Sequence, residues 1–192
     1  MARPKPSGRD AIPALVETLL TELGEDPERQ GLKATPARVS RALRELTDGY
    51  GVRPEDVIAD AVFDQDYDEM VVVKDIPFYS LCEHHMLPFF GTSHVGYLPK
   101  GRVVGLSKIP RLVGVFAHRL QLQERLTKEI AEALNSTLEP KGVGVVVEAR
   151  HLCMEMRGVQ KPGGQMITSC MLGTFRRDPR TRAEFLDLVR RP

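Results

Sequence analysis

Hydrophobic and polar positions recur with the period of a helix in the first quarter of the chain. Apolar residues return every three to four positions from Asp10 to Leu23, and again after Thr35, where Pro36 suits a first helical position. Gly24 follows the first run, and Gly49 follows the second, as is common at helix ends. We therefore predict two amphipathic helices, preceded by a loose polar tail over residues 1–9.

The pattern after residue 69 alternates between strand-like and helix-like runs. Apolar and β-branched residues predict strands over 70–75, 91–98, 103–106, 143–154 and 165–175. Helical stripes predict helices over 107–119 and 120–138, and a short C-terminal helix from Asp178. This order predicts an α+β fold, in which an antiparallel four-stranded sheet carries two helices on one face. It divides the chain into a helical N-terminal region, 1–68, and a second domain, 69–192.

Composition narrows the class of protein. Hydrophobic residues make up 42% and charged residues 28% of 192 positions, as in ordinary soluble globular proteins. The net charge of +1 gives no electrostatic reason to expect nucleic acid or an anionic membrane as partner. No apolar run approaches the roughly 18 residues of a membrane helix. Three cysteines do not make a disulfide framework, so we expect a reducing, cytoplasmic setting.

Two short windows hold most of the metal-binding side chains. They contain Cys82, His84, His85, His151 and Cys153, five of the eight cysteine and histidine residues. Thiolate and imidazole are the ligands that zinc prefers. We predict Cys82, His85 and Cys153 as ligands, with His84 and His151 as free imidazoles for proton transfer. If the strand predicted over 143–154 is regular, His151 and Cys153 share one of its faces.

The spacing leaves two kinds of zinc site open. A catalytic site has three protein ligands and an open position, whereas a structural site closes around four and would only join the two windows. Neighbouring side chains diverge, so His84 and His85 are not both expected on one ion. The wider Cys82–His85 spacing favours His85, but reversed roles for the two histidines remain an alternative.

Longer motifs around these windows point to a known family. They read SLCEHH at 80–85, GLSKIPR at 105–111, LQERLT at 122–127 and HLCMEMRGV at 151–159. In this order they resemble the signatures of GTP cyclohydrolase I, over about Thr35 to Leu188. The resemblance implies a tunnelling fold (ββααββ), Zn²⁺ as cofactor and a homodecamer of two pentamers. It also implies the first step of tetrahydrofolate and pterin biosynthesis, in which GTP yields formate and 7,8-dihydroneopterin triphosphate.

The resemblance also implies roles for single residues. Glu124 would accept hydrogen bonds from guanine, with Gln123 a weaker candidate for the same pocket. His84 and His151 would transfer protons, and Ser107 would act near the ribose. The triphosphate would be bound by basic residues, which individually are more often solvated surface charges: Lys108, Arg111, Arg157, Arg38 and, where the family commonly has lysine, Arg41.

Two other classes of function compete with this one. The chain could be a non-catalytic, zinc-stabilised nucleotide-binding protein, or another tunnelling-fold enzyme that acts on a pterin or purine. No Gly-x-x-x-x-Gly-Lys-Ser/Thr loop is present, which excludes a P-loop nucleotide site. The CEHH motif at 82–85 and the QERL motif at 123–126 favour the cyclohydrolase over its relatives.

Overall fold

A computed structural model describes residues 10–190 of the chain, which divide into two compact units. The smaller unit ends at Asp48, and the larger begins at Gly49. Residues 49–68 therefore group with the larger unit, whereas the boundary predicted from sequence lies at 68. The tail predicted over residues 1–9 lies outside the described residues. Within 10–190, no helix has the length and apolar character needed to cross a membrane.

The smaller unit is a pair of helices that pack against each other, α1 (Ile12–Glu22) and α2 (Thr35–Glu45). Asp10 joins them, because its carboxylate accepts a hydrogen bond from Ser40 Oγ at 2.6 Å and lies 2.7 Å from the Arg44 guanidinium. Each helix has a proline in its first turn. Both helices predicted from the periodicity are confirmed.

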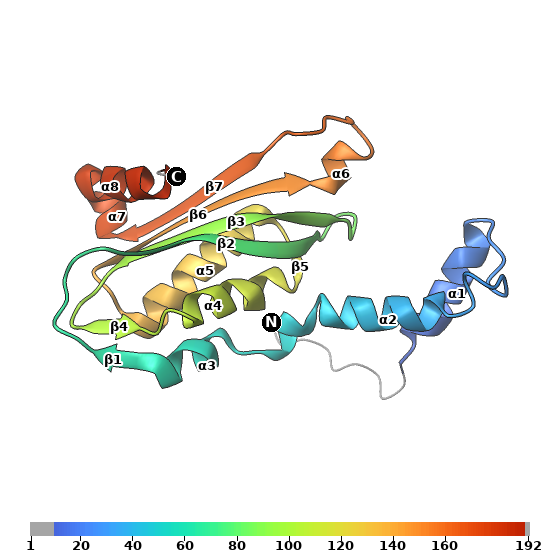
Figure 1. Ribbon diagram of the computed structural model, residues 1–192, viewed down its shortest axis with the longest axis horizontal. Coiled ribbons are helices and arrows are strands. Elements are labelled where there is room, and N and C mark those ends of the chain that lie inside the picture. Colours follow the sequence, from blue (N-terminus) through green and yellow to red (C-terminus); the bar gives the residue numbers. More distant parts are fainter. Residues whose placement is uncertain (1–9, 191–192) are drawn as a thin grey trace. The chain divides into compact units, whose positions relative to one another are not determined.

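The larger unit is built on one five-stranded sheet in the order β5-β2-β3-β6-β7 (Figure 1). Four long strands pair antiparallel: β2 (Val71–Cys82), β3 (Pro88–Leu98), β6 (Gly142–His151) and β7 (Met166–Gly173). Helices α4 (Lys108–Ala117) and α5 (Gln123–Leu138) cover one face (Figure 1). The predicted α+β architecture, with four antiparallel strands and two helices on one face, is confirmed.

Shorter elements complete the larger unit, and the first of them begins at Asp48, the last residue of the smaller unit. They are the 3-10 turns η1 (Asp48–Gly51) and η2 (Ala59–Ala61), α3 (Pro54–Ile58), β1 (Val62–Asp64), β4 (Arg102–Val104), β5 (Leu120–Gln121), α6 (Leu152–Glu155), α7 (Thr174–Arg177) and α8 (Pro179–Arg190). The strand predicted over 103–106 is β4, but it pairs with β1 in a separate two-stranded sheet. Leu120 and Gln121, predicted as helix, form β5 parallel to the end of β2.

Both faces of the sheet are packed. On β6, Val143, Val145 and Val147 belong to the main core beneath α4 and α5. Val146 points the other way and packs with the aromatic rings of Phe175 and Phe185 from α7 and α8. This burial on both sides explains why β6 is an almost continuous apolar run.

The end of β6 differs from the prediction. The strand predicted over 143–154 stops at His151, and Cys153 lies in the single helical turn α6. The prediction that His151 and Cys153 share a strand face is therefore wrong. The register explains the stop, because His151 pairs with Phe89, and the preceding residue of β3 is Pro88, which has no N–H to continue the ladder.

Candidate active site

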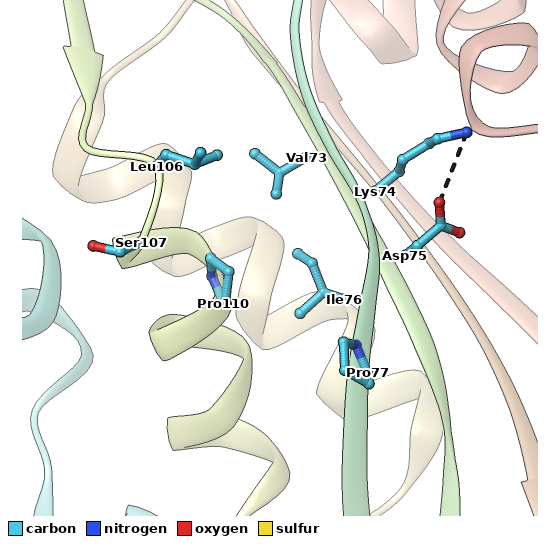
Figure 2. A pocket seen from close by; sticks show the side chains of 8 residues that line it. All are labelled: Val73, Lys74, Asp75, Ile76, Pro77, Leu106, Ser107 and Pro110. Carbon is cyan, nitrogen blue, oxygen red and sulfur yellow. Dashed lines mark ion pairs between the residues drawn. The ribbon is translucent and has the colours of Figure 1, made fainter.

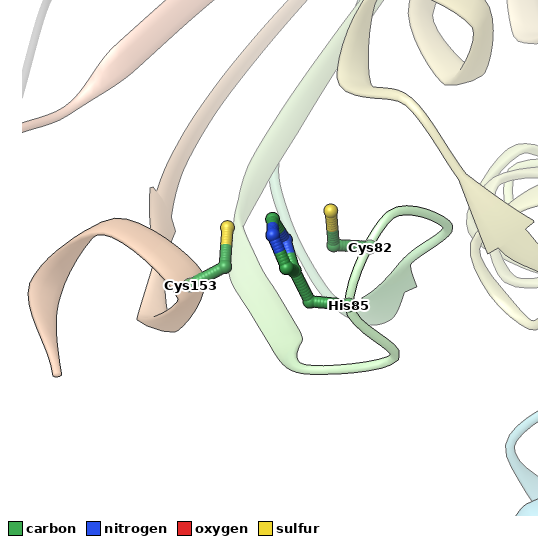
Figure 3. A group of neighbouring side chains, drawn as sticks. All are labelled: Cys82, His85 and Cys153. Carbon is green, nitrogen blue, oxygen red and sulfur yellow. The ribbon is translucent and has the colours of Figure 1, made fainter. Parts of the chain in front are cut away.

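The three predicted metal ligands lie together at one end of the sheet. Cys82 ends β2, His85 lies in the turn that follows, and Cys153 lies in α6. Their ligand atoms all lie within 4.8 Å of one another, and the three side chains extend side by side from two separate segments (Figure 3). Ligand atoms around one tetrahedral zinc lie about 3.5 Å apart, so small side-chain movements would suffice. The set could hold a metal ion, and its donors are those that zinc prefers.

The turn between β2 and β3 brings His85 back beside Cys82. The Cys82 N–H donates to the Leu87 carbonyl at 2.9 Å, and the Met86 N–H donates to the Cys82 carbonyl at 2.8 Å. Met86 has a φ of 55°, a left-handed conformation that few non-glycine residues adopt. Hydrogen bonds within the turn thus help to fix the backbone of the chelating segment.

The surroundings of Cys153 favour its thiol form over the thiolate. Burial raises the pKa of the Cys153 thiol, and the neighbouring Cys82 thiol raises it further. A bound dication reverses this preference, because it stabilises thiolates directly. Metal binding at this site is therefore coupled to the release of protons.

His151 has a fixed ring. It stacks on Phe89 with ring centres 4.7 Å apart and an interplanar angle of 1°. Its Nε2 lies 2.8 Å from Oε1 of Gln123, a residue that is only 1% exposed. Burial lowers the pKa of His151, which favours the neutral imidazole.

The amide of Gln123 decides which nitrogen of His151 carries the proton. Its Nε2 lies 3.0 Å from the Val147 carbonyl oxygen and 2.9 Å from that of Met166. These two oxygens can only accept, so the amide nitrogen must face them and Oε1 must face His151. The neutral imidazole of His151 therefore donates from Nε2, and its Nδ1 keeps a free lone pair.

Other predicted site residues gather around this group. The exposed ring of His84 lies 6.1 Å from that of His85, edge to face. Arg157 Nη1 donates a hydrogen bond to His85 Nε2 at 3.0 Å. Glu124 is exposed in the first turn of α5, and its charge raises the pKa of His151 against the larger effect of burial. The structure thus brings these three residues together with the possible ligands and His151.

The predicted phosphate-binding residues of α4 lie elsewhere. Ser107 precedes α4 and lines a pocket of about 660 Å³, across from Val73 and Ile76 of β2 (Figure 2). Ile76 is six positions before Cys82 on the same strand, which at about 3.3 Å per residue separates them by roughly 20 Å. Within one chain, Ser107 therefore does not meet the metal-ligating group.

The cations near Ser107 already have an acidic neighbour. Lys108 Nζ lies 2.7 Å from a carboxylate oxygen of Asp60. This contact lowers the pKa of Asp60, and the charge of the exposed Arg111 adds to the effect. Arg38 and Arg41 are exposed on α2 of the smaller unit.

Some contacts at this end of the sheet could not be predicted from the pattern of residues along the chain. Phe89 stacks on His151 only because β3 and β6 pair in a particular register. Gln123 is a predicted substrate contact, and its amide lies in the interior, bonded to β6, β7 and His151. Arg125 forms an ion pair with Glu83, which lies in the turn between Cys82 and His85. Only the place of Arg125 in the LQERLT motif could have suggested a role for it.

Comparisons with known proteins agree on one family. The family model described as GTP cyclohydrolase I matches residues 12–190. A protein of Synechococcus sp. (strain JA-3-3Ab) named GTP cyclohydrolase 1 is 60% identical, covering 95% of this chain and 80% of the relative. Proteins of the same name from Coxiella burnetii (strain Dugway 5J108-111) and Homo sapiens are 57% and 55% identical, covering 92% and 93% of this chain and 96% and 72% of the relatives.

Proposed function

The chain belongs to the GTP cyclohydrolase I family, and we propose that it opens the guanine ring of GTP by hydrolysis. Formate leaves, and rearrangement of the ribose gives 7,8-dihydroneopterin triphosphate. One observation supports this most directly. The possible metal ligands Cys82, His85 and Cys153 lie at the same end of the sheet as His151, whose ring is oriented by Gln123.

Cys82, His85 and Cys153 would hold the metal, and we propose zinc as that metal. When bound by three protein ligands, zinc supplies Lewis acidity and a nucleophilic water near neutral pH. If His85 coordinates through Nε2, the lone pair that now accepts from Arg157 is used, and Arg157 becomes available to an anionic substrate. Thiolate ligands need a reducing compartment, which supports a cytoplasmic location.

Glu124 and the two unligated histidines would act on the purine. The Glu124 carboxylate can accept hydrogen bonds from the guanine N1–H and exocyclic amine, a donor pair that adenine does not present. A site built for such donors rejects an analogue that lacks them. His151 can accept a proton at Nδ1 while Gln123 holds its Nε2–H, and the exposed His84 can protonate the ring nitrogen as the bond opens.

We propose that a second copy of the chain completes the triphosphate site. Ser107, Lys108 and Arg111 are suited to phosphate binding, but Ser107 lies opposite a strand position roughly 20 Å from Cys82 at about 3.3 Å per residue. A GTP bound with its base at the metal group would therefore take phosphate contacts from a neighbouring subunit. This supports a homo-oligomer, and we propose the decamer of two pentamers that the resemblance implies, with Arg38 and Arg41 as further phosphate ligands.

The proposal is tested by incubating the purified protein with GTP and measuring formate and, after oxidation, a fluorescent pterin. ATP serves as the control nucleotide, since it lacks the guanine donors. Removing the metal with a chelator should abolish turnover, and adding zinc should restore it. A folded, zinc-loaded protein that releases no formate from GTP would contradict the proposed reaction, and turnover that survives complete metal removal would contradict the metal's role.

A further inference from the structure

The turn that carries two of the possible metal ligands is attached to β5 and to the start of α5 through Glu83. This residue lies between Cys82 and the two histidines. Its backbone N–H donates to the Gln121 carbonyl at 3.0 Å, and its carboxylate forms an ion pair with the guanidinium of Arg125. Glu83 is therefore held at its backbone and at its side chain by the same neighbouring segment.

The guanidinium of Arg125 is itself held in one orientation. Its Nε donates to Oε1 of Gln121 at 3.0 Å, and Gln121 is only 1% exposed. The amide nitrogen of Gln121 donates to the Phe116 carbonyl at 3.1 Å and to the Glu129 carboxylate at 2.7 Å. Because the amide nitrogen faces two acceptors, its oxygen must face Arg125. A chain of fixed groups thus runs from Glu129 through Gln121 and Arg125 to Glu83.

The ion pair between Arg125 and Glu83 should affect the local geometry of the turn more than the stability of the whole domain. The side chains of Arg125 and Glu83 are 41% and 31% exposed, and ion pairs at that exposure contribute little to the stability of a whole domain. Glu83 lies inside the chelating turn, however, so the contacts of its backbone and side chain act on the segment between Cys82 and His85. The pair is therefore placed to affect metal geometry more than folding.

We propose that Arg125 and Glu83 form a positioning pair, which holds the turn from Cys82 to His85 in the geometry that binds the metal. This inference rests on the proposed metal site. Groups that orient metal ligands from outside the coordination shell typically change metal affinity by about 10- to 100-fold when removed. Neither residue needs to contact GTP for this role.

The test is a zinc affinity measurement on the full-length oligomer by competition with a chromophoric chelator. Glu83→Ala and Arg125→Ala should each weaken zinc binding by about 10- to 100-fold, with a shifted absorption spectrum of the cobalt-substituted protein. The double variant should bind no more weakly than the weaker single variant, because both remove one interaction. Arg102→Ala is the matched control, since it breaks the 3.1 Å pair with Glu139 on another part of this unit and should leave zinc affinity unchanged.

Wild-type zinc affinity in folded Glu83→Ala and Arg125→Ala would overturn the proposal, and so would single effects that multiply in the double variant. If an alanine variant does not fold, Glu83→Gln and Arg125→Lys replace it. These conservative changes keep part of the hydrogen bonding, so an intermediate loss of affinity is expected and an unchanged affinity overturns the pair. A wild-type protein that binds no zinc would instead overturn the metal site on which the inference rests.

Discussion

Replacing Gln123 with leucine tests whether one buried amide links folding to catalysis. Leucine is similar in volume, so the change removes hydrogen bonds without opening a large cavity. The amide nitrogen bonds the carbonyls of Val147 and Met166, and lies 3.2 Å from Thr168 Oγ1, while Oε1 bonds His151. At about 0.5–1.5 kcal/mol for each bond, the loss of three or four should lower the free energy of unfolding by about 1.5–6 kcal/mol.

The effect on turnover should exceed what this loss of stability explains. Without Gln123 Oε1, the ring of His151 keeps its stack on Phe89 but loses the partner that fixes its protonated nitrogen. General acid–base catalysis contributes about 10²–10⁴-fold, so we expect kcat to fall roughly 10²-fold, with a much smaller change in KM. Zinc content should remain near that of the wild type, because Gln123 contacts none of the possible ligands through a described hydrogen bond.

Urea unfolding at a fixed protein concentration measures the first effect, since the stability of the proposed oligomer would depend on concentration. Steady-state kinetics with GTP, at a temperature where the variant stays folded, measures the second. Gln165→Leu is the control, because Gln165 is exposed and its loss should change stability by no more than about 0.5 kcal/mol. A folded Gln123→Leu protein with wild-type kcat would refute the argument that this amide orients a catalytic imidazole.

Three further predictions concern the metal, the base and pH. Cys82→Ser or Cys153→Ser should lose both zinc and turnover in metal analysis and GTP assays, and full activity in either would remove the residue from the ligand set. Glu124→Ala should raise KM for GTP and lower kcat/KM at least 10²-fold, as expected where a site pairs with substrate donors. The free energy of unfolding in urea should stay within about 0.5 kcal/mol of the wild type, because the side chain is exposed. A loss of stability as large as the loss of transition-state binding would make its role structural. Burial lowers the pKa of His94, whose Nδ1 accepts the Asp75 N–H, so this contribution to stability is present above about pH 6.5 and is lost as pH falls through the lowered pKa. His94→Gln should therefore reduce the fall in the free energy of unfolding below about pH 6.5 in urea titrations. An unchanged slope would assign that pH dependence to other groups.

The long elements could be predicted because their patterns persist over many residues. The stripes of α4 and α5 and the valines of β6 repeat often enough to outweigh local exceptions. The two residues of β5 carry no such repeat, and Leu120 fits the apolar spacing of the helix that follows. Their strand pairing depends on where β2 ends, which is tertiary information.

The same contrast between local and tertiary information separates the possible metal ligands from Gln123. Cys82 and His85 could be chosen from spacing, because a chelate within one turn is a local property. The role of Gln123 could not, since it depends on carbonyls of β6 and β7 that lie far away in sequence. The placement of Cys153 on a strand failed for a similar reason, because Pro88 on another strand ends the ladder.

The register of the sheet connects the core to the candidate site. Phe89 lies opposite His151, and the same alignment places Val95 opposite Val145 within the buried core. A slip of one residue would exchange the two faces of β6, moving its core valines to the side packed by Phe175 and Phe185 and turning His151 away from Gln123. Packing energy spread over the whole strand therefore holds a histidine at its end, where an isolated turn could not. This is why one short loop can supply two possible metal ligands while the third and the fixed imidazole come from a segment almost seventy residues away.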